Sequence, residues 1–432
     1  MIKRLNTGQN DFKDAFAQLI SVSGTDKARV SEVVKEIIED VKSSGDAAVE
    51  KYSRKFDGSS FAGVKQIVLD DNIKRRVLSI GQKDQIRAMT KAYERIRLYH
   101  SHQKIEPYSY TDSKGSHFAM RVLPLERVGI YVPGGKAAYP SSVMMNAIPA
   151  SVAGVDEIIM VVPSISGQIN DLVLAAAAIS GVDRIFNVGG AQAIAALAFG
   201  TQSIPRVDKI VGPGNAYVAE AKRQVFGSVG IDMVAGPSEI LIIGDESSDP
   251  EWVTMDLFSQ AEHDELARAI LISPSNDLLN KVEQCISTKL PTMSRFEIIR
   301  KSLSKNGALV KVVNMDEACQ LANQIAPEHL ELSVKDPSIL LTKIKNAGSI
   351  FSGKFSSEAL GDYCAGPNHV LPTSGSARFS SGLSVFDFLK RTSVINVSED
   401  GAAELGPIAS TLARGETLTA HAASAELRFK KN

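Results

Sequence analysis

Gln260 and His263 are two side chains whose types and spacing suit metal binding. They stand three residues apart in Ser259-Gln260-Ala261-Glu262-His263-Asp264. On the helix that we predict there, side chains three apart share a face, so both can reach one ligand. The alternative is that His263 hydrogen-bonds a neighbouring loop or caps it, as a lone histidine commonly does. Gln260 alone would not be singled out, because amides are uncommon zinc ligands.

A carboxylate stands beside an imidazole in Ala326-Pro327-Glu328-His329-Leu330. This pair suits acid/base catalysis at a loop or helix start, with Glu328 activating water and His329 shuttling a proton. A surface turn explains the same five residues equally well. Asp362 lies in a polar, glycine-flanked segment, Gly361-Asp362-Tyr363-Cys364-Ala365-Gly366-Pro367-Asn368-His369, as either a metal ligand or a helix cap. Its local sequence favours the cap.

Glu416 and His421 lie five residues apart near the C-terminal end of the sequence. On one regular helix, such a gap separates side chains by about 140°. Both can therefore serve one site only if a helix begins between them or if their roles differ. Cys364 is a candidate thiol nucleophile, but no basic residue stands beside it in the sequence. An inert, small core residue is the simpler interpretation of Cys364.

Four glycine-rich loops follow predicted strands: Val132-Pro133-Gly134-Gly135-Lys136, Val188-Gly189-Gly190-Ala191-Gln192, Val211-Gly212-Pro213-Gly214-Asn215 and Ala235-Gly236-Pro237-Ser238-Glu239. Ligands bind beyond the carboxyl ends of parallel strands, where glycine lets the backbone come close. None of the four reads G-x-G-x-x-G, and Gly135-Lys136 continues into Ala137, so there is no P-loop. Taken alone, each loop is more often a plain turn than a cofactor site. Together they indicate a binding crevice.

These loops must be positioned by repeated strand–helix units. Short β-branched runs begin near Val128, Val155, Val182, Val207 and Ile231, at intervals of 27, 27, 25 and 24 residues. Alanine-rich helical stretches lie between them, at 172–179, 191–199 and 216–226. A strand followed by a helix at such a period predicts βα units and a mainly parallel sheet.

The rest of the chain divides into further predicted parts. Apolar residues from Val30 to Val41 recur at helical spacing, and a second helical stretch runs from about 71 to 100. Strands are expected at 240–243, 269–273, 308–313 and 349–352, with helices at 251–265, 277–289, 315–325 and 418–429. We expect four regions: a mainly helical 1–126 leading into the first α/β domain, an α/β nucleotide-binding domain at 127–237, an α/β domain with metal and catalytic residues at 238–384, and a small tail at 385–432. The tail is too poor in large apolar residues for its own core and is expected to pack on a partner subunit.

Charge and composition exclude several classes of protein. The 432 residues include 48 basic and 49 acidic ones, a net charge of −1, so no field draws the chain to nucleic acid or anionic lipid. Three scattered cysteines fit neither a disulfide framework nor a thiolate zinc site and suit a reducing compartment. The first residues lack the apolar core of a signal peptide, and no apolar stretch approaches the roughly 20 residues that span a bilayer. We therefore expect a cytoplasmic protein without nucleic-acid or membrane partners.

Eight segments, taken in order, resemble the histidinol dehydrogenase family over nearly the whole chain. They are Arg127-Val128-Gly129-Ile130-Tyr131-Val132-Pro133-Gly134-Gly135, Asn187-Val188-Gly189-Gly190-Ala191-Gln192-Ala193, Gly212-Pro213-Gly214-Asn215, Ala235-Gly236-Pro237-Ser238-Glu239, Gln260-Ala261-Glu262-His263-Asp264, Ala326-Pro327-Glu328-His329-Leu330, the loop 361–372, and Glu416-Thr417-Leu418-Thr419-Ala420-His421. Any one segment alone is weak evidence. Their number and order make the resemblance specific.

The resemblance implies a set of site residues. One Zn²⁺ per subunit would be held by Gln260, His263, Asp362 and His421, and the NAD crevice would be lined by Tyr131, Gln192 and Asn215. Histidinol would be contacted by Ser238, His329, Glu416 and the four metal ligands. The implied fold is α/β, two related domains with incomplete Rossmann-like parallel sheets plus small helical N- and C-terminal pieces. The implied assembly is a homodimer whose sites are shared between subunits.

The implied activity is the four-electron oxidation of L-histidinol, through L-histidinaldehyde, to L-histidine with two NAD, a step of histidine biosynthesis. His329 would take the hydroxyl proton and Glu328 would activate the water that the aldehyde needs. One alternative is a zinc/NAD dehydrogenase of the same fold acting on another alcohol, such as a sulfonated diol. Glu416 favours a cationic amine over an anionic substrate. Another alternative is a non-catalytic zinc- or nucleotide-binding regulator, which would have no need of the pair Glu328 and His329.

Overall fold

The computed structural model describes residues 2–21, 27–56, 63–69, 75, 78–79, 83–134, 139–163 and 169–429. The start of the helix expected from about residue 71 lies outside these ranges, as do Gly135 and Lys136 of the first glycine-rich loop. What is described of that helix is α5 (Lys83–Ser101). No helix within the described ranges combines the length and the apolar character needed to cross a membrane.

The first parallel sheet contains the five strands whose starts the sequence period predicts. They are β5 (Arg127–Tyr131), β6 (Glu157–Val161), β7 (Arg184–Phe186), β8 (Lys209–Val211) and β9 (Gly230–Ile231). The connecting helices are α6 (Pro140–Ala153), α7 (Asp171–Ser180), α8 (Gly190–Phe199) and α9 (Ala216–Val225). The spatial order is β7-β6-β5-β8-β9, that is, third, second, first, fourth and fifth along the chain. This is the order of a dinucleotide-binding sheet without its sixth strand.

The second parallel sheet repeats that order. Its strands β10 (Glu239–Gly244), β11 (Arg268–Ser273), β12 (Ala308–Lys311), β13 (His329–Ser333) and β14 (Ser349–Ser352) lie as β12-β11-β10-β13-β14. Its helices are α10 (Pro250–Ala261), α11 (Asn276–Lys289), α12 (Phe296–Asn306), α13 (Met315–Ile325) and α14 (Ser338–Lys343). The prediction of an α/β fold with two related, incomplete Rossmann-like sheets is confirmed.

The N-terminal segment adds one outer strand to each sheet. Strand β1 (Lys3–Asn6) runs parallel to β12, and β2 (Gln66–Val68) runs antiparallel to β7, so both take the equivalent edge. Residues 3–6 therefore belong to the second sheet, although they precede the first sheet in the chain. Between the two strands lie the helices α1 (Phe12–Ile20), α2 (Lys27–Ser44) and α3 (Asp46–Phe56).

Apolar burial explains these elements. Every residue of β10 is buried, as expected for a strand covered by helices on both faces. The helical stripe read from the sequence is the buried face of α2, where Val34, Ile37, Ile38 and Val41 pack into the core of the first sheet. That helix packs on α8 and α9.

Two local predictions need correction. The segment around Glu328 and His329 was expected as a loop or helix start. Glu328 does lie in a loop, but His329 is the first residue of β13, paired between β10 and β14. Glu331 interrupts the apolar run of this strand and hides it from a pattern search. His263 was expected on a helix, but α10 ends at Ala261 and His263 lies in the turn beyond its C-cap.

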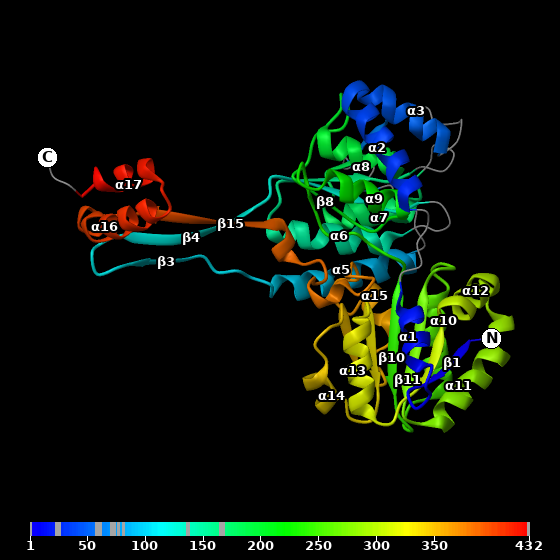
Figure 1. Ribbon diagram of the computed structural model, residues 1–432. Coiled ribbons are helices and arrows are strands. Elements are labelled where there is room, and N and C mark those ends of the chain that lie inside the picture. The colour runs from blue at the N-terminus through cyan, green and yellow to red at the C-terminus, as the bar shows by residue number, and fades with distance from the viewer. Residues whose placement is uncertain are drawn as a thin grey trace.

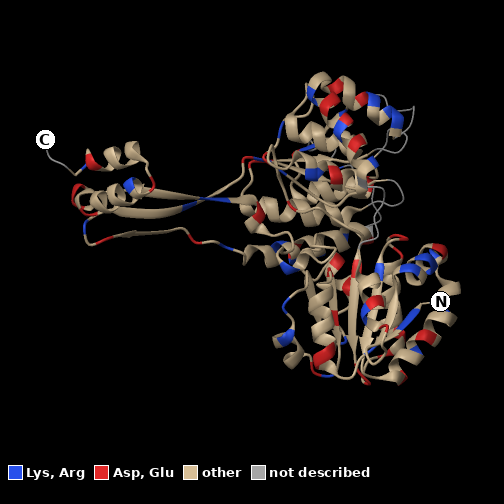
Figure 2. Ribbon diagram, viewed as in Figure 1, with Lys and Arg blue, Asp and Glu red and all other residues tan. Residues whose placement is uncertain are grey.

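The end of the chain forms an arm that projects away from the two sheet lobes (Figure 1). Strand β15 (Leu389–Asn396) pairs antiparallel with β4 (His117–Pro124), which pairs with β3 (Tyr108–Thr111). Helices α16 (Glu399–Gly415) and α17 (Thr419–Glu426) pack on each other at its tip. The arm leaves large apolar side chains exposed, among them Tyr108, Tyr110, Ile395, Leu405, Ile408, Leu412, Leu418 and Leu427. Acidic and basic residues are intermixed over both lobes, in keeping with the net charge near zero (Figure 2).

Candidate active site

The three candidate cofactor residues lie at the carboxyl edge of the first sheet. Tyr131 is the last residue of β5, Gln192 lies in the first turn of α8, and Asn215 follows β8 as the N-cap of α9. Strand order reverses between β5 and β8, and that reversal is where open α/β sheets bind nucleotides. The location predicted from the glycine-rich loops is therefore a recognised ligand position.

Each of these side chains has a defined local role. The Tyr131 hydroxyl accepts the Gly190 backbone N–H at 3.2 Å, and the Asn215 Oδ1 accepts the N–H groups of Tyr217 and Val218 at 3.0 and 3.1 Å. Gln192 donates to Ser53 Oγ at 3.4 Å, while its Oε1 is buried without a hydrogen-bond partner among the described residues. A buried acceptor without a hydrogen-bond donor lowers the stability of the fold, so this oxygen suits a ligand that supplies a donor.

The candidate catalytic and metal residues lie at the amino edge of the second sheet, not at its carboxyl edge. Glu239 begins β10 and His329 begins β13, while the end of α10 brings Gln260 to the same place. Asp362 comes from α15 (Glu358–Tyr363), which follows β14. Residues 232–238 lead directly from the carboxyl edge of the first sheet into β10, so a short linker joins the two edges.

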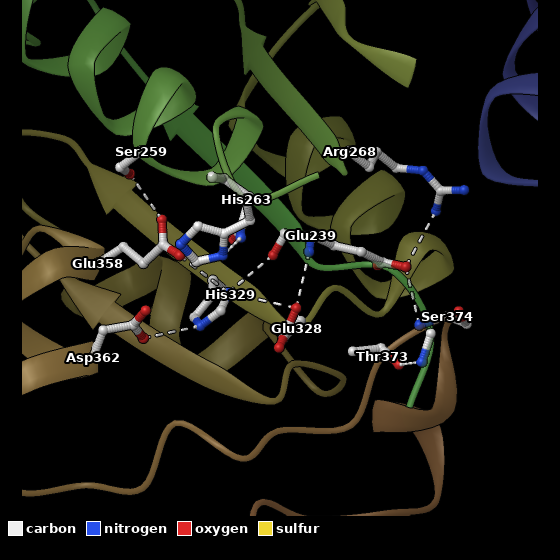
Figure 3. Close-up of polar contacts among 12 residues, drawn as sticks. Glu239, Ser259, His263, Arg268, Glu328, His329, Glu358, Asp362, Thr373 and Ser374 are labelled. Carbon is white, nitrogen blue, oxygen red and sulfur yellow. Dashed lines mark hydrogen bonds and ion pairs between the residues drawn. The ribbon is translucent and has the colours of Figure 1, made fainter. Parts of the chain in front are cut away.

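His329 is held at both ring nitrogens (Figure 3). Its Nδ1 lies 3.0 Å from the backbone carbonyl oxygen of Glu239, and its Nε2 lies 3.5 Å from Oδ1 of Asp362. Burial disfavours the charged ring, but the nearby carboxylates of Glu358, Glu328 and Asp362 outweigh burial and raise the pKa of His329 well above its usual value. The raised pKa favours the protonated ring, and in its neutral form such a ring is a strong base.

Glu328 is a buried carboxyl beside this histidine. Its Oε2 accepts the Glu239 backbone N–H at 2.8 Å and lies 3.8 Å from Nδ1 of His329. Burial raises the pKa of Glu328 to about 8, against the opposing effect of His329. A carboxylate with a pKa near neutrality is a better base than an ordinary one, so Glu328 suits proton abstraction from water.

Glu358 is a further buried carboxyl that the sequence reasoning missed. Its Oε2 accepts the Ser259 hydroxyl at 3.0 Å, its Oε1 lies 3.6 Å from Nδ1 of His329, and its side chain is 2% exposed. Burial raises the pKa of Glu358 to about 7. His329, Glu358 and Asp362 each offer a ligand atom, and these atoms lie within 4.8 Å of one another. The four-residue spacing of Glu358 and Asp362 on one short helix was the available signal.

Gln260 and His263 fit a metal ion at this place. The Gln260 amide forms the most hydrogen bonds in the orientation that points its nitrogen at acceptors. In this orientation the nitrogen donates to Oε1 of Glu358 at 2.9 Å and to the Glu239 carbonyl at 3.1 Å. Its oxygen then lies 3.3 Å from Nδ1 of His263. Two ligand atoms of a tetrahedral zinc site, each at about 2.1 Å, are about 3.4 Å apart.

The charge states fit as well. His263 is exposed in the single chain. Partial loss of solvent lowers the pKa of its imidazole, and the charge of Asp362 acts on that pKa in the opposite direction. The pKa of Asp362 is itself lowered, because its contact with His329 and the nearby histidines His369 and His263 outweigh burial, so its carboxylate favours the ionised form. A neutral imidazole, an amide oxygen and a carboxylate make a nitrogen and oxygen donor set suited to zinc.

A pocket opens beside these groups and is lined in part by His329. Its lining includes Asp362, Phe351, Asn368, His369 and Leu371. Asn368 is buried and donates to the backbone oxygen of Met145 at 2.6 Å, so the loop after α15 is fixed to α6 of the first lobe. The site thus lies where the second sheet meets the first lobe.

Three candidate residues stand apart from this cluster or only border it. Ser238 is half-buried and directly precedes β10, whereas Glu416 and His421 are exposed on the arm. Glu416 is the C-cap of α16, Thr417 has a φ of +63°, and α17 begins at Thr419, so a helix boundary separates Glu416 from His421. Helices α16 and α17 lie at the tip of the arm, away from α15 (Figure 1). A single chain does not bring His421 to Asp362.

Known proteins similar to this chain match it over nearly its whole length. The sequence model of a family described as histidinol dehydrogenase matches residues 21–429. The chain is 57% identical over 429 residues to a histidinol dehydrogenase of Dechloromonas aromatica, covering 99% of each protein. It is 57% identical over 428 residues to one of Pseudomonas aeruginosa, covering 99% of this chain and 97% of that protein. A crystal structure of histidinol dehydrogenase from Elizabethkingia anophelis superposes with a TM-score of 0.91 at 33% identity, covering 99% of this chain and 98% of that one.

Proposed function

The chain belongs to the histidinol dehydrogenase family, and we propose that it oxidises L-histidinol through L-histidinaldehyde to L-histidine with two NAD. The single observation that carries this proposal is the likeness to curated histidinol dehydrogenases at 57% identity over 99% of both lengths. The buried pair Glu328 and His329 supports it chemically, and His329 lies with Glu358 and Asp362 in a cluster that could hold a metal ion.

We assign the first proton transfer to His329. In this proposal the Nδ1 proton is donated to the Glu239 carbonyl, 3.0 Å away, and Nε2, which has no hydrogen-bond partner among the described residues, is the basic nitrogen. The substrate hydroxyl would lie against Nε2 in the pocket, and the nearby carboxylates would stabilise the imidazolium that forms. Proton removal prepares the alcohol carbon to lose a hydride.

We assign water activation to Glu328. An aldehyde must add water before a second hydride can leave, because the hydrate supplies the oxygen of the carboxylate. Glu328 is buried, its pKa is raised to about 8, and its Oε2 is held by the Glu239 N–H. Enclosure of the aldehyde between the two steps keeps a reactive amino aldehyde out of solution.

Zinc and NAD are the cofactors of this proposal. When bound, zinc would hold the substrate through its nitrogen atoms and NAD would accept the hydrides. Gln260, His263 and Asp362 would hold the metal from one chain, and Tyr131, Gln192 and Asn215 would line the cofactor crevice. The buried, partnerless Oε1 of Gln192 supports the crevice, and the donor set around His263 supports zinc.

The remaining ligand would come from a second copy of the chain in a homodimer. His421 would complete the zinc site, and Glu416 and Ser238 would contact histidinol. The exposed apolar side chains of the arm and the distance of the arm from the lobes support an exchange of arms between subunits. A symmetric dimer would then contain two equivalent sites, each built from both chains. Three cysteines without disulfides suit a cytoplasmic location.

The rival substrates and the regulator are distinguished by one experiment. Purified protein is mixed with L-histidinol, NAD and zinc, and NADH and histidine are both counted. The proposal predicts two NADH for each histidine. One NADH with released aldehyde would remove the second step, and no NADH with histidinol but turnover of a sulfonated diol would favour the paralogous dehydrogenase. A protein that binds zinc and NAD but turns over neither substrate would be the regulator.

A further inference from the structure

Beneath the cofactor crevice, the structure holds a fully buried ion pair outside the catalytic cluster. Lys222 of α9 pairs with Asp232, which follows β9, and their side chains are 2% and 1% exposed. Burying two charges is costly, and an apolar pair of similar size often supports folding equally well. The presence of charges at this position therefore calls for an explanation other than stability.

Both residues of the ion pair hydrogen-bond to Gly212, in the loop 212–215 that follows β8. Lys222 Nζ donates to the carbonyl oxygen of Gly212 at 2.8 Å, and Asp232 Oδ2 accepts the N–H of the same Gly212 at 2.8 Å. Gly212 is the first residue beyond β8, where the hydrogen bonds of the sheet end. The two partners of the ion pair thus take over both backbone groups of the residue at which the loop leaves the sheet.

Gly212 occupies a position that only glycine fits without strain. Its φ is +113°, a conformation that side-chain-bearing residues rarely adopt, and an added Cβ would lie 2.2 Å from the backbone oxygen of Tyr131. The loop therefore packs directly on the end of β5. Tyr131 is one partner of this contact and Asn215 ends the same loop, and both are assigned to the NAD crevice.

We infer that Lys222 and Asp232 are positioning residues for the cofactor: their ion pair fixes the loop 212–215 against Tyr131 in the geometry that binds NAD. This inference rests on the proposed NAD-dependent function. Neither side chain has to touch NAD, because both side chains are buried and act through Gly212. Asp232 also accepts the Met233 N–H at 2.6 Å, which ties the start of the linker 232–238 to the same point.

The test compares two variants with a matched control. Asp232→Asn removes one charge and keeps an acceptor for Gly212. The double variant Lys222→Met/Asp232→Leu removes both charges and both hydrogen bonds without leaving an unpaired charge. The control is Lys209→Met, at the opposite end of β8, where Lys209 donates to the Asp387 backbone oxygen at 2.7 Å. NAD affinity is measured by calorimetry without histidinol, followed by KM and kcat with histidinol.

We expect both test variants to raise the Kd and KM for NAD by about tenfold or more, with kcat at saturating NAD within about twofold of wild type. Lys209→Met should leave the Kd for NAD unchanged. A lowered Tm with unchanged Kd, or failure of both test variants to fold while the control folds, would show a purely structural pair and overturn the inference. Wild-type protein that binds NAD but does not oxidise histidinol would contradict the proposed function and leave this test intact. Wild-type protein that does not bind NAD would overturn both.

Discussion

His329 Nδ1 lies 3.0 Å from the backbone carbonyl oxygen of Glu239, a residue of the neighbouring strand. Pairing of β13 with β10 therefore holds Nδ1 of the imidazole against a backbone acceptor and fixes the orientation of the ring. The imidazole is oriented by a backbone atom that no side-chain substitution can remove. Its position is a property of the sheet.

His329→Gln keeps a polar side chain at the start of β13 but supplies no base. We expect kcat for histidinol oxidation to fall by about 10²- to 10⁴-fold, the usual contribution of a positioned base. The Kd for NAD, measured by calorimetry, should stay within about twofold, because the cofactor residues belong to the other sheet. A variant with wild-type kcat would exclude His329 as the base.

Glu328→Gln separates the two oxidation steps. Water is needed only after the aldehyde has formed, so oxidation of added histidinaldehyde should fall by about 10²-fold or more while the first hydride transfer is largely spared. Single-turnover NADH formation from histidinol and from the aldehyde measures the two steps separately. Equal losses in both would remove Glu328 from water activation.

The raised pKa of Glu328 also predicts a pH dependence of stability in metal-free protein. The pKa is about 8 in the folded protein against 4.5 ordinarily. Between these pH values the unfolded chain releases the proton and the folded chain retains it, so the free energy of unfolding falls as pH rises. Glutamine cannot ionise. The Tm of Glu328→Gln relative to wild type should therefore rise from pH 5 to pH 8 and then level off. A constant difference would contradict the shifted pKa.

Metal removal should abolish activity reversibly. The assigned ligands are nitrogen and oxygen atoms without a thiolate, so we expect a strong chelator to strip the metal and zinc to restore turnover. Metal content is measured by atomic absorption beside NADH formation. Full activity in protein shown to be metal-free would end the zinc proposal.

Mixed dimers test the shared site. Asp362→Ala and His421→Ala are each expected to be inactive, and the two are unfolded and refolded together. If each site joins Asp362 of one chain to His421 of the other, a mixed dimer has one site with both lesions and one intact site. About half of the dimers are mixed, so activity should recover to roughly a quarter of wild type. No recovery, with mixed dimers demonstrated by mass spectrometry, would place the whole site in one chain.

The sequence alone predicted the parts of the fold that depend on local periodicity. The regular return of Val128, Val155, Val182 and Val207 follows from strands and helices of fixed length, and β5 to β8 start within two residues of those positions. The helical stripe of α2 was visible for the same reason. Each helix or strand must bury one face, so apolar residues recur in the sequence at the period of that element.

Only the tertiary structure decided how distant residues meet. Strand β1 joins β12 across some three hundred residues, and no local pattern marks such a partner. Strand β13 was missed because Glu331, buried against Glu358, replaces an apolar residue. Glu358 itself was missed because its proximity to His329 arises from packing between α15 and the start of β13.

The location of the site at the amino edge of the second sheet also lay beyond the sequence. Loop composition predicted the carboxyl edge of the first sheet, because glycines mark places where backbone approaches a ligand. Nothing local shows that the opposite edge of a second, identically ordered sheet faces the same crevice. The recurrence of apolar residues in the sequence predicts each helix and strand, because it reflects which face of that element is buried. Which edges face each other is decided by the packing of whole lobes and by the linker 232–238 that joins them.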